Sequence, residues 1–155
     1  MISRPQKKRI AILGSTGSVG IQALDVIRTH TAYFDAELIS AFHNASALIE
    51  QAIEFQPRWC VIVDKGLYAR VSKALQGTGT TVMSGPEALA EAIGLSKAET
   101  VLDATVGLGA LPAILETLKQ GRTLALANKE SLVSAGHLIA PFLRQGKGQV
   151  LPVDS

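Results

Sequence analysis

Near its start the chain reads Ile10-Ala11-Ile12-Leu13-Gly14-Ser15-Thr16-Gly17-Ser18-Val19-Gly20. Residues 9–14 form a short apolar run that ends at Gly14, which is typical of a buried strand. Residues 18–30 then carry apolar side chains at helical spacing. A strand, a glycine-rich turn and a helix in this order predict an α/β domain whose first turn binds phosphate.

The three glycines of this turn have separate physical uses. Gly14 permits a tight turn off the strand, and Gly17 allows backbone N–H groups to approach a pyrophosphate. Gly20 is expected to let the helix lie close to the sheet. The positive end of the helix dipole and the hydroxyl groups of Thr16 and Ser18 would add to phosphate binding. An ordinary glycine-rich turn is the alternative, whereas a Walker A loop is excluded because no Gly-Lys-Ser/Thr follows.

The rest of the chain repeats the alternation of strand and helix. Further strands are predicted over residues 38–42, 60–64, 80–83, 100–104, 123–127 and 149–153. Helices are predicted over residues 45–55, 66–76, 110–120 and 130–145, the last one punctuated by Gly136 and Pro141, and a further helix is predicted to open at residues 85–87. Short turns between alternating elements predict a doubly wound parallel sheet, a Rossmann-like NAD(P)-binding fold, over residues 1–155.

Composition and charge exclude several classes of protein. The chain has 155 residues, of which 47% are hydrophobic and only 5% aromatic, so the core is expected to consist of Ala, Val, Ile and Leu. Its net charge is +2 and no basic stripe continues beyond residues 7–9, which disfavours nucleic-acid binding. Cys60 is the only cysteine and lies in an apolar run, so it is expected to be buried and unreactive. No stretch reaches transmembrane length or resembles a signal peptide, and a soluble cytoplasmic protein is expected.

The end of the second strand distinguishes between the two nicotinamide cofactors. NAD-specific domains usually carry an acidic residue there, which binds the ribose 2′-hydroxyl group. This strand is followed instead by Phe42-His43-Asn44-Ala45-Ser46. Asn44, Ser46 and a protonatable His43 would tolerate a 2′-phosphate, so NADP(H) is predicted over NAD(H).

Two later segments carry polar groups at strand ends. Residues 127–133 read Ala-Asn-Lys-Glu-Ser-Leu-Val, where Asn128 and Glu130 are explained by helix capping and the helix dipole. Lys129 is unfavourable at a helix start and indicates an anionic ligand nearby. Residues 151–155 read Leu-Pro-Val-Asp-Ser, and Asp154 with Ser155 suits a hard cation or a polar substrate, or else a plain turn.

Together, residues 14–20, 127–133 and 151–155 closely resemble the 1-deoxy-D-xylulose 5-phosphate reductoisomerases, from about residue 8 to residue 155. The resemblance implies the N-terminal NADPH-binding domain of an enzyme that converts 1-deoxy-D-xylulose 5-phosphate to 2-C-methyl-D-erythritol 4-phosphate in isoprenoid biosynthesis. It further implies a divalent ion (Mg²⁺, Mn²⁺ or Co²⁺), a sugar phosphate substrate and, for the whole enzyme, a bacterial homodimer.

The resemblance also implies roles for individual residues. Asn44 would lie near the adenosine 2′-phosphate, Lys129 would act on the bound substrate, Asp154 would bind the metal, and Ser155 would bind the substrate. The remaining cofactor contacts would come from Gly14, Thr16, Gly17, Ser18, Val19, Phe42, His43, Asn128 and Glu130.

This sequence departs from the family pattern in two places. The family often has Gly followed by Lys or Ser where this chain has Phe42 and His43. The family motif also continues past Ser155 with Glu and His, and the Glu is a metal ligand. We therefore expect a fragment whose metal- and substrate-binding domain would follow, and which is inactive alone.

Two other functions remain open from the residues themselves. A different NADP-dependent reductase, such as one like homoserine dehydrogenase, would share the first loop but not the two later motifs. A non-catalytic nucleotide-sensing module would make Lys129 and Asp154 incidental. The gene beyond residue 155 would distinguish these alternatives.

Overall fold

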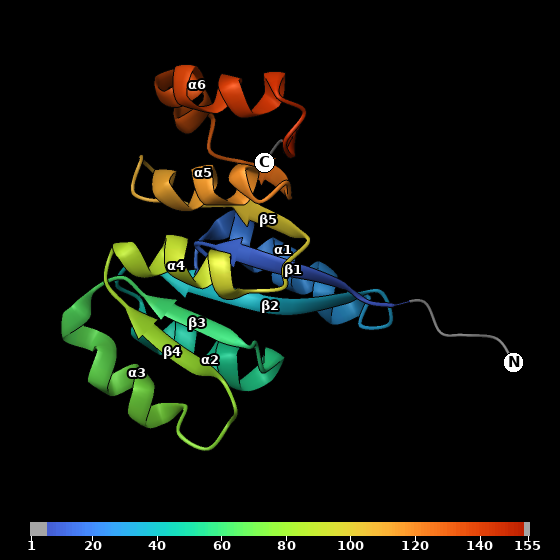
Figure 1. Cartoon of the computed structure of the whole chain (residues 1–155). Coiled ribbons are helices and arrows are strands. Elements are labelled where there is room, and N and C mark those ends of the chain that lie inside the picture. The colour runs from blue at the N-terminus through green and yellow to red at the C-terminus, as the bar shows by residue number, and fades with distance from the viewer. Residues whose placement is uncertain (1–5, 154–155) are drawn as a thin grey trace, which may run out of the picture.

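The computed structural model describes residues 6–153, in which strands and helices alternate as the sequence predicts (Figure 1). The strands are β1 (Lys8–Leu13), β2 (Phe34–Ala41), β3 (Trp59–Ile62), β4 (Thr81–Ser84), β5 (Thr100–Asp103), β6 (Thr123–Leu126) and β7 (Gln149–Pro152). The helices are α1 (Ser18–Thr29), α2 (Ala45–Phe55), α3 (Tyr68–Ala74), α4 (Glu87–Leu95), α5 (Leu111–Lys119) and α6 (Lys129–Arg144), with a 3₁₀ turn over Lys65–Leu67.

The seven strands form one sheet in the order β4-β3-β2-β1-β5-β6-β7, and every neighbouring pair is parallel. The chain builds outward from β1 to β4, then returns to the other side of β1 with β5. Because the order reverses there, the carboxyl ends of β1 and β5 form the edge at which such sheets bind ligands. The predicted doubly wound fold is confirmed.

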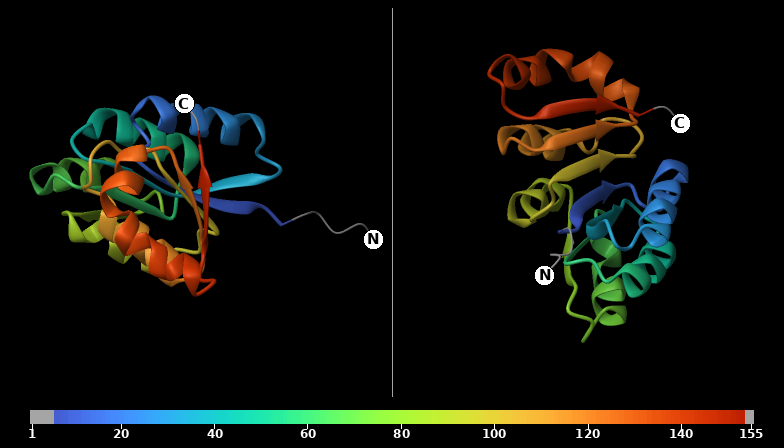
Figure 2. Two further views of the ribbon diagram at one scale, coloured as in Figure 1. Left: turned by 90° about the horizontal axis from the view of Figure 1, so that it is seen from above. Right: turned by 90° about the vertical axis from the view of Figure 1, so that its right-hand side faces the viewer.

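Helices cover the two faces of the sheet in separate groups (Figure 2, right). The buried side chains of α1, α2 and α3, among them Leu24, Leu48 and Val71, pack with Ile12 and Ile39 of the strands on one face. On the opposite face α4 and α5 pack against β1, β2, β3 and β5, and α5 and α6 pack against β6. The core is made almost entirely of Ala, Val, Ile and Leu, as the low aromatic content predicts.

Two elements differ from their predicted bounds for visible reasons. β2 begins at Phe34, four residues before the predicted apolar run. The prediction missed its first half because Asp35 and Glu37 are polar residues there and that half is less buried. The predicted helix 66–76 is divided into the 3₁₀ turn and α3. The side chain of Asp64 caps that turn, with Oδ1 accepting from the Gly66 N–H group at 2.9 Å.

α6 runs through both residues that were predicted to punctuate it. Pro141 lies inside the helix, near its end, and Gly136 lies in its middle. A proline lacks the N–H donor of one helical hydrogen bond, and its ring crowds the carbonyl group four residues earlier. The helix is packed through the buried Ala135 and Ile139, which offsets this cost. None of the helices within residues 6–153 is both long and apolar enough to cross a membrane.

Cys60 lies on β3, and its side chain is completely buried. This burial raises the pKa of the thiol to about 12, because the thiolate would lose its hydration. This environment agrees with the prediction that Cys60 is buried and unreactive.

Candidate functional site

A crevice of about 290 Å³ lies beyond the carboxyl ends of β1, β2 and β5. Its walls come from the turn after β1, the residues after β2 and the loop after β5. The lining residues are Gly14, Thr16, Gly17, Ala41, Phe42, His43, Asn44, Ala104, Thr105 and Val106. Most of the predicted cofactor residues of the first half of the chain therefore meet at one opening.

The glycines of the turn after β1 occupy three different environments. Gly14 has a φ of +80°, and a Cβ there would lie 2.9 Å from the Ala104 carbonyl oxygen, in the loop after β5. A Cβ on Gly20 would lie 2.3 Å from the Gly14 carbonyl oxygen. The close approach at Gly20 is therefore to the turn itself, whereas an approach to the sheet was predicted. A Cβ on Gly17 would lie 3.7 Å from its nearest neighbour, the Gly14 carbonyl oxygen, which is an ordinary van der Waals contact.

The start of α1 is suited to an anion. Gly17 is the residue before the helix and supplies no side-chain cap, so no carboxylate or hydroxyl group of that residue competes for the first N–H groups. Ser18 is exposed at the first helical position, and Thr16 lines the crevice with its side chain half-buried. Val19 is half-buried against the core.

Three residues that the sequence analysis did not single out hold this turn in place. The Ser15 hydroxyl group is buried and donates to Gln51 Oε1 at 2.7 Å, while Gln51 Nε2 donates to the Ser15 carbonyl oxygen at 2.9 Å. Ser40 Oγ accepts from the Gly14 N–H group at 3.1 Å. The turn is therefore fastened to both β2 and α2. The sequence signal was Gln51 itself, a polar residue beside the apolar face of a predicted helix.

The residues after β2 form the second wall of the crevice. Asn44 caps α2, with Oδ1 accepting from the Ala47 N–H group at 3.1 Å. His43 is exposed, and its Nδ1 atom lies 3.4 Å from Oδ2 of Asp64, which follows β3. The ring of Phe42 lies against the loop after β5, where a Cβ on Gly109 would be 2.7 Å from Phe42 Cζ. Phe42 thus bridges the two walls of the crevice.

Asn128 joins the start of α6 to the loop after β5. Its Oδ1 atom accepts from the Glu130 N–H group at 3.0 Å, which is the predicted helix cap, and its Nδ2 atom donates to the Gly107 carbonyl oxygen at 2.5 Å. Lys129 and Glu130 are exposed and line a second cavity, of about 480 Å³, with Leu108, Val133 and Ser134. The three predicted residues of this segment therefore share one corner of the carboxyl edge.

The predicted metal ligand Asp154 and the predicted substrate residue Ser155 lie outside the described residues. Within residues 6–153 no group of three or more His, Cys, Asp or Glu side chains is placed to hold a metal ion. The described part of the chain does not by itself fit a divalent ion.

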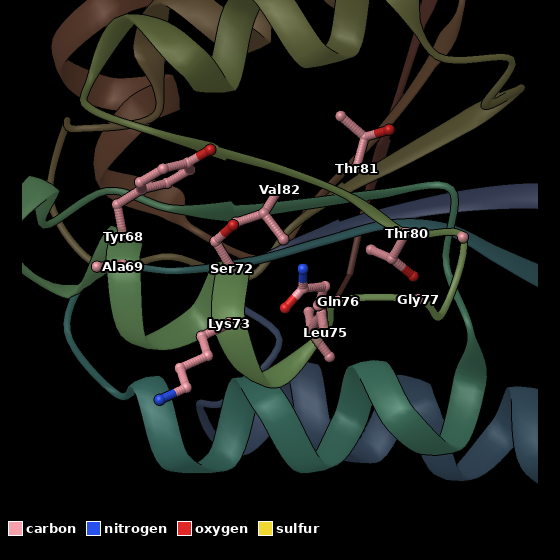
Figure 3. A pocket seen from close by; sticks show the side chains of 11 residues that line it. Tyr68, Ala69, Ser72, Lys73, Leu75, Gln76, Gly77, Thr80, Thr81 and Val82 are labelled. Atoms are coloured by element: carbon pink, nitrogen blue, oxygen red, sulfur yellow. The ribbon is translucent and has the colours of Figure 1, made fainter.

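A third cavity, of about 520 Å³, lies between α3 and the edge strand β4. Tyr68, Ser72, Lys73 and Gln76 approach it from α3 and the segment that follows, opposite Thr80 and Thr81 (Figure 3). It contains none of the predicted site residues and lies at the β4 edge of the sheet, whereas β1 and β5 lie in the middle. We therefore assign the ligand site to the crevice at the switch point.

Asp103 is a buried acid beneath the crevice, at the end of β5. Its Oδ1 atom accepts from the backbone N–H group and the hydroxyl group of Thr105, at 3.1 and 2.5 Å. Its Oδ2 atom has no hydrogen-bond partner among residues 6–153. Burial raises the pKa of Asp103, and the two hydrogen bonds from Thr105 oppose that rise.

This environment predicts that the stability of the fold depends on pH through Asp103. Because the pKa is raised in the folded state, the contribution of Asp103 is complete below its unfolded pKa, about 3.9, and is lost as pH rises through the folded pKa. We expect Asp103→Asn, which is neutral throughout, to gain in free energy of unfolding relative to the unmodified chain as pH rises from about 4 to about 7. Urea unfolding of both proteins tests this, and a difference independent of pH would contradict it.

The chain is similar in sequence to known proteins. Residues 10–136 match the family model described as 1-deoxy-D-xylulose 5-phosphate reductoisomerase. A reductoisomerase of that name from Bacteroides fragilis is 41% identical over 150 residues, which are 97% of this chain and 39% of the relative. One from Chlamydia caviae is 40% identical over 149 residues, which are 96% of this chain and 39% of the relative.

Solved structures of such enzymes have the same fold. The reductoisomerase of Zymomonas mobilis in complex with NADPH superimposes with a TM-score of 0.91 at 36% identity, covering 97% of this chain and 39% of that one. A DOX-P reductoisomerase in complex with NADPH, fosmidomycin and magnesium gives a TM-score of 0.90 at 34% identity, covering 96% of this chain and 36% of that one. The chain thus spans about two fifths of the length of its relatives.

Proposed function

Because the chain belongs to the 1-deoxy-D-xylulose 5-phosphate reductoisomerase family, we propose that it is the NADPH-binding domain of such an enzyme. The observation that carries the proposal is the crevice at the switch point, which is lined by Gly14, Thr16 and Gly17 of a turn that has no room for a Cβ at Gly20. In a related enzyme of 36% identity, the same fold is in complex with NADPH.

The cofactor's pyrophosphate would lie on the turn after β1. Thr16, Gly17, Ser18 and Val19 would supply hydroxyl and backbone N–H donors at the start of α1, and Gly14 would give the turn its shape. The exposed position of Gly17 and the missing side-chain cap support this assignment. When bound, NADPH would supply a hydride, and these residues would orient it.

The adenosine end would lie between the residues after β2 and the loop after β5. Asn44 and His43 would approach the 2′-phosphate, and Phe42 would contact the adenosine. No carboxylate directly follows β2, although Asp64 approaches His43 from the next strand. A dianionic phosphate on the ribose is therefore favoured over a free 2′-hydroxyl group.

This assignment predicts a clear preference between cofactors. In calorimetric titrations of the chain we expect NADPH to bind at least about tenfold more tightly than NADH, because charge-assisted hydrogen bonds to the 2′-phosphate are absent with NADH. Equal affinity for the two would contradict the preference, and binding of neither would contradict the proposed function itself.

The other end of the cofactor would reach α6. Asn128 and Glu130 would contact the cofactor near the reacting ring, and Lys129 would stabilise charge on the bound sugar phosphate. Lys129 and Glu130 line the cavity beside Leu108, and the hydrogen bond of Asn128 to Gly107 holds α6 at the loop after β5, which supports this. Asp154 would be a metal ligand and Ser155 a substrate contact, as the family resemblance implies.

The activity proposed for the whole enzyme is rearrangement and reduction of 1-deoxy-D-xylulose 5-phosphate, in a homodimer that uses Mg²⁺, Mn²⁺ or Co²⁺. We propose that residues 1–155 alone lack this activity, since residues 6–153 contain no cluster able to hold the ion. Product formed by the chain with substrate, NADPH and Mg²⁺ would contradict this.

A further inference from the structure

Arg70 of α3 reaches across to the start of α2. Its Nη2 atom donates a hydrogen bond of 2.6 Å to the hydroxyl group of Ser46. Ser46 is the second residue of α2 and lies two positions after Asn44, the cap of that helix and part of the crevice wall. A guanidinium group is thereby held beside the segment that follows β2, although it comes from a helix that begins 22 residues after Ser46.

The hydrogen bond to Ser46 uses little of the hydrogen-bonding capacity of Arg70. A guanidinium group has five N–H donors in a planar fork that matches carboxylate and phosphate groups. Among residues 6–153, Arg70 forms no ion pair within 4.0 Å, and the one hydrogen bond found for it goes to a neutral hydroxyl group. Arg70 and Ser46 are both exposed, so an anion can reach them.

The neighbouring cations are directed elsewhere. His43 faces the Asp64 carboxylate at 3.4 Å, so that pair adds little net positive charge even when the imidazole is protonated. The side chain of Lys65 extends toward Gly85, where its Cε atom would lie 2.8 Å from an added Cβ. Arg70 is the cation that a hydrogen bond to Ser46 holds at the corner beside Asn44.

From this arrangement we infer that Arg70 is a specificity-determining residue that binds the 2′-phosphate of NADPH together with Ser46. The inference rests on the proposed function and deepens it. The phosphate replaces Ser46 Oγ as the acceptor for the guanidinium fork, and the Ser46 hydroxyl group turns from accepting to donating. Selectivity for the phosphorylated cofactor then comes from α3 as well as from the residues directly after β2.

Calorimetric titration of Arg70→Gln with NADPH and with NADH tests the inference. We expect NADPH to bind about 10- to 100-fold more weakly than to the unmodified chain, which is the effect of losing a charged bidentate contact. NADH affinity is expected to stay within about twofold, because NADH has no phosphate at that position. Arg58→Gln is the matched control, because it removes the same charge from an exposed residue. Arg58 precedes β3 and so lies at the amino ends of the strands, away from the crevice at their carboxyl ends. Both affinities are expected to stay unchanged.

The outcomes separate the inference from the proposed function. Unchanged NADPH affinity in Arg70→Gln, or an equal loss for both cofactors, would overturn the role of Arg70 while the unmodified chain still binds NADPH. An equal loss of NADPH affinity in Arg58→Gln would also overturn it, because the effect would then be one of net charge. If the unmodified chain binds neither cofactor, the proposed function falls and the inference with it.

Discussion

Replacing Gly20 by alanine is expected to weaken NADPH binding roughly 100-fold or more, since two or more charge-assisted backbone contacts would be lost. The added Cβ would lie 2.3 Å from the Gly14 carbonyl oxygen and 2.6 Å from Ser15 Cα. Both neighbours are backbone atoms of the turn, so no side chain can rotate away. Either the turn or the start of α1 must shift, and the proposed phosphate site is formed by both.

In the same variant, the free energy of unfolding should fall by less than the free energy of NADPH binding. Overpacking typically costs about 1–3 kcal/mol, and alanine recovers up to about 1 kcal/mol relative to glycine within a helix. We therefore expect urea unfolding to show a cooperative transition with a loss of about 1–2 kcal/mol.

Gly136→Ala is the control for the substitution in Gly20. It also lies within a helix, but an added Cβ meets no atom within 4 Å. It should stabilise the chain by about 0.5–1 kcal/mol and leave NADPH affinity unchanged. If Gly20→Ala binds NADPH as tightly as Gly136→Ala does, the turn after β1 is not the phosphate site.

Replacing Gln51 by leucine is expected to weaken NADPH binding about tenfold, although the side chain does not line the crevice. Leucine removes the donor to the Ser15 carbonyl oxygen and the nearer acceptor of the buried Ser15 hydroxyl group, which keeps only the Ser40 carbonyl oxygen at 3.3 Å. Unsatisfied buried polar groups cost about 1–3 kcal/mol, and the turn would relieve this cost by moving toward water. Gln51 thus acts as a positioning residue.

The control for Gln51 is its neighbour. Glu50→Leu changes an exposed residue of the same helix, and we expect it to leave NADPH affinity unchanged. Gln51→Glu retains an oxygen acceptor for Ser15 but loses the amide donor, so its NADPH affinity should fall between those of the unmodified chain and Gln51→Leu. A loss of stability in Gln51→Leu with full NADPH affinity would show that the residue supports only the fold.

Local sequence signals account for most of the fold. Gly14, Gly77 and Gly121 have positive φ angles at turns, where glycine is favoured, and they interrupt the apolar runs. Such signals predicted the alternation of elements and hence the parallel sheet. They failed at the start of β2, because Asp35 and Glu37 hid a strand whose first half is partly exposed.

The site was less accessible to sequence reasoning than the fold. The glycine turn and the Asn128 cap have local signatures and were predicted, although Gly20 approaches the turn and not the sheet. The contacts of Gln51 with Ser15 and of Arg70 with Ser46 join residues 36 and 24 positions apart, so they depend on how helices pack on the sheet. No periodicity in the sequence reports such contacts, although a polar residue next to an apolar helix face, as at Gln51, is a usable signal.

The most direct test of the central claim is to map the NADPH site on the chain by two-dimensional ¹H–¹⁵N nuclear magnetic resonance. We predict that the largest changes in amide chemical shift on addition of NADPH occur in residues 14–20, with further changes in residues 42–46 and 104–109, which form the crevice walls. On addition of NADH, the changes in amide chemical shift should be smaller than with NADPH, above all in residues 42–46. Changes confined to the cavity between α3 and β4, with none in residues 14–20, would contradict the account.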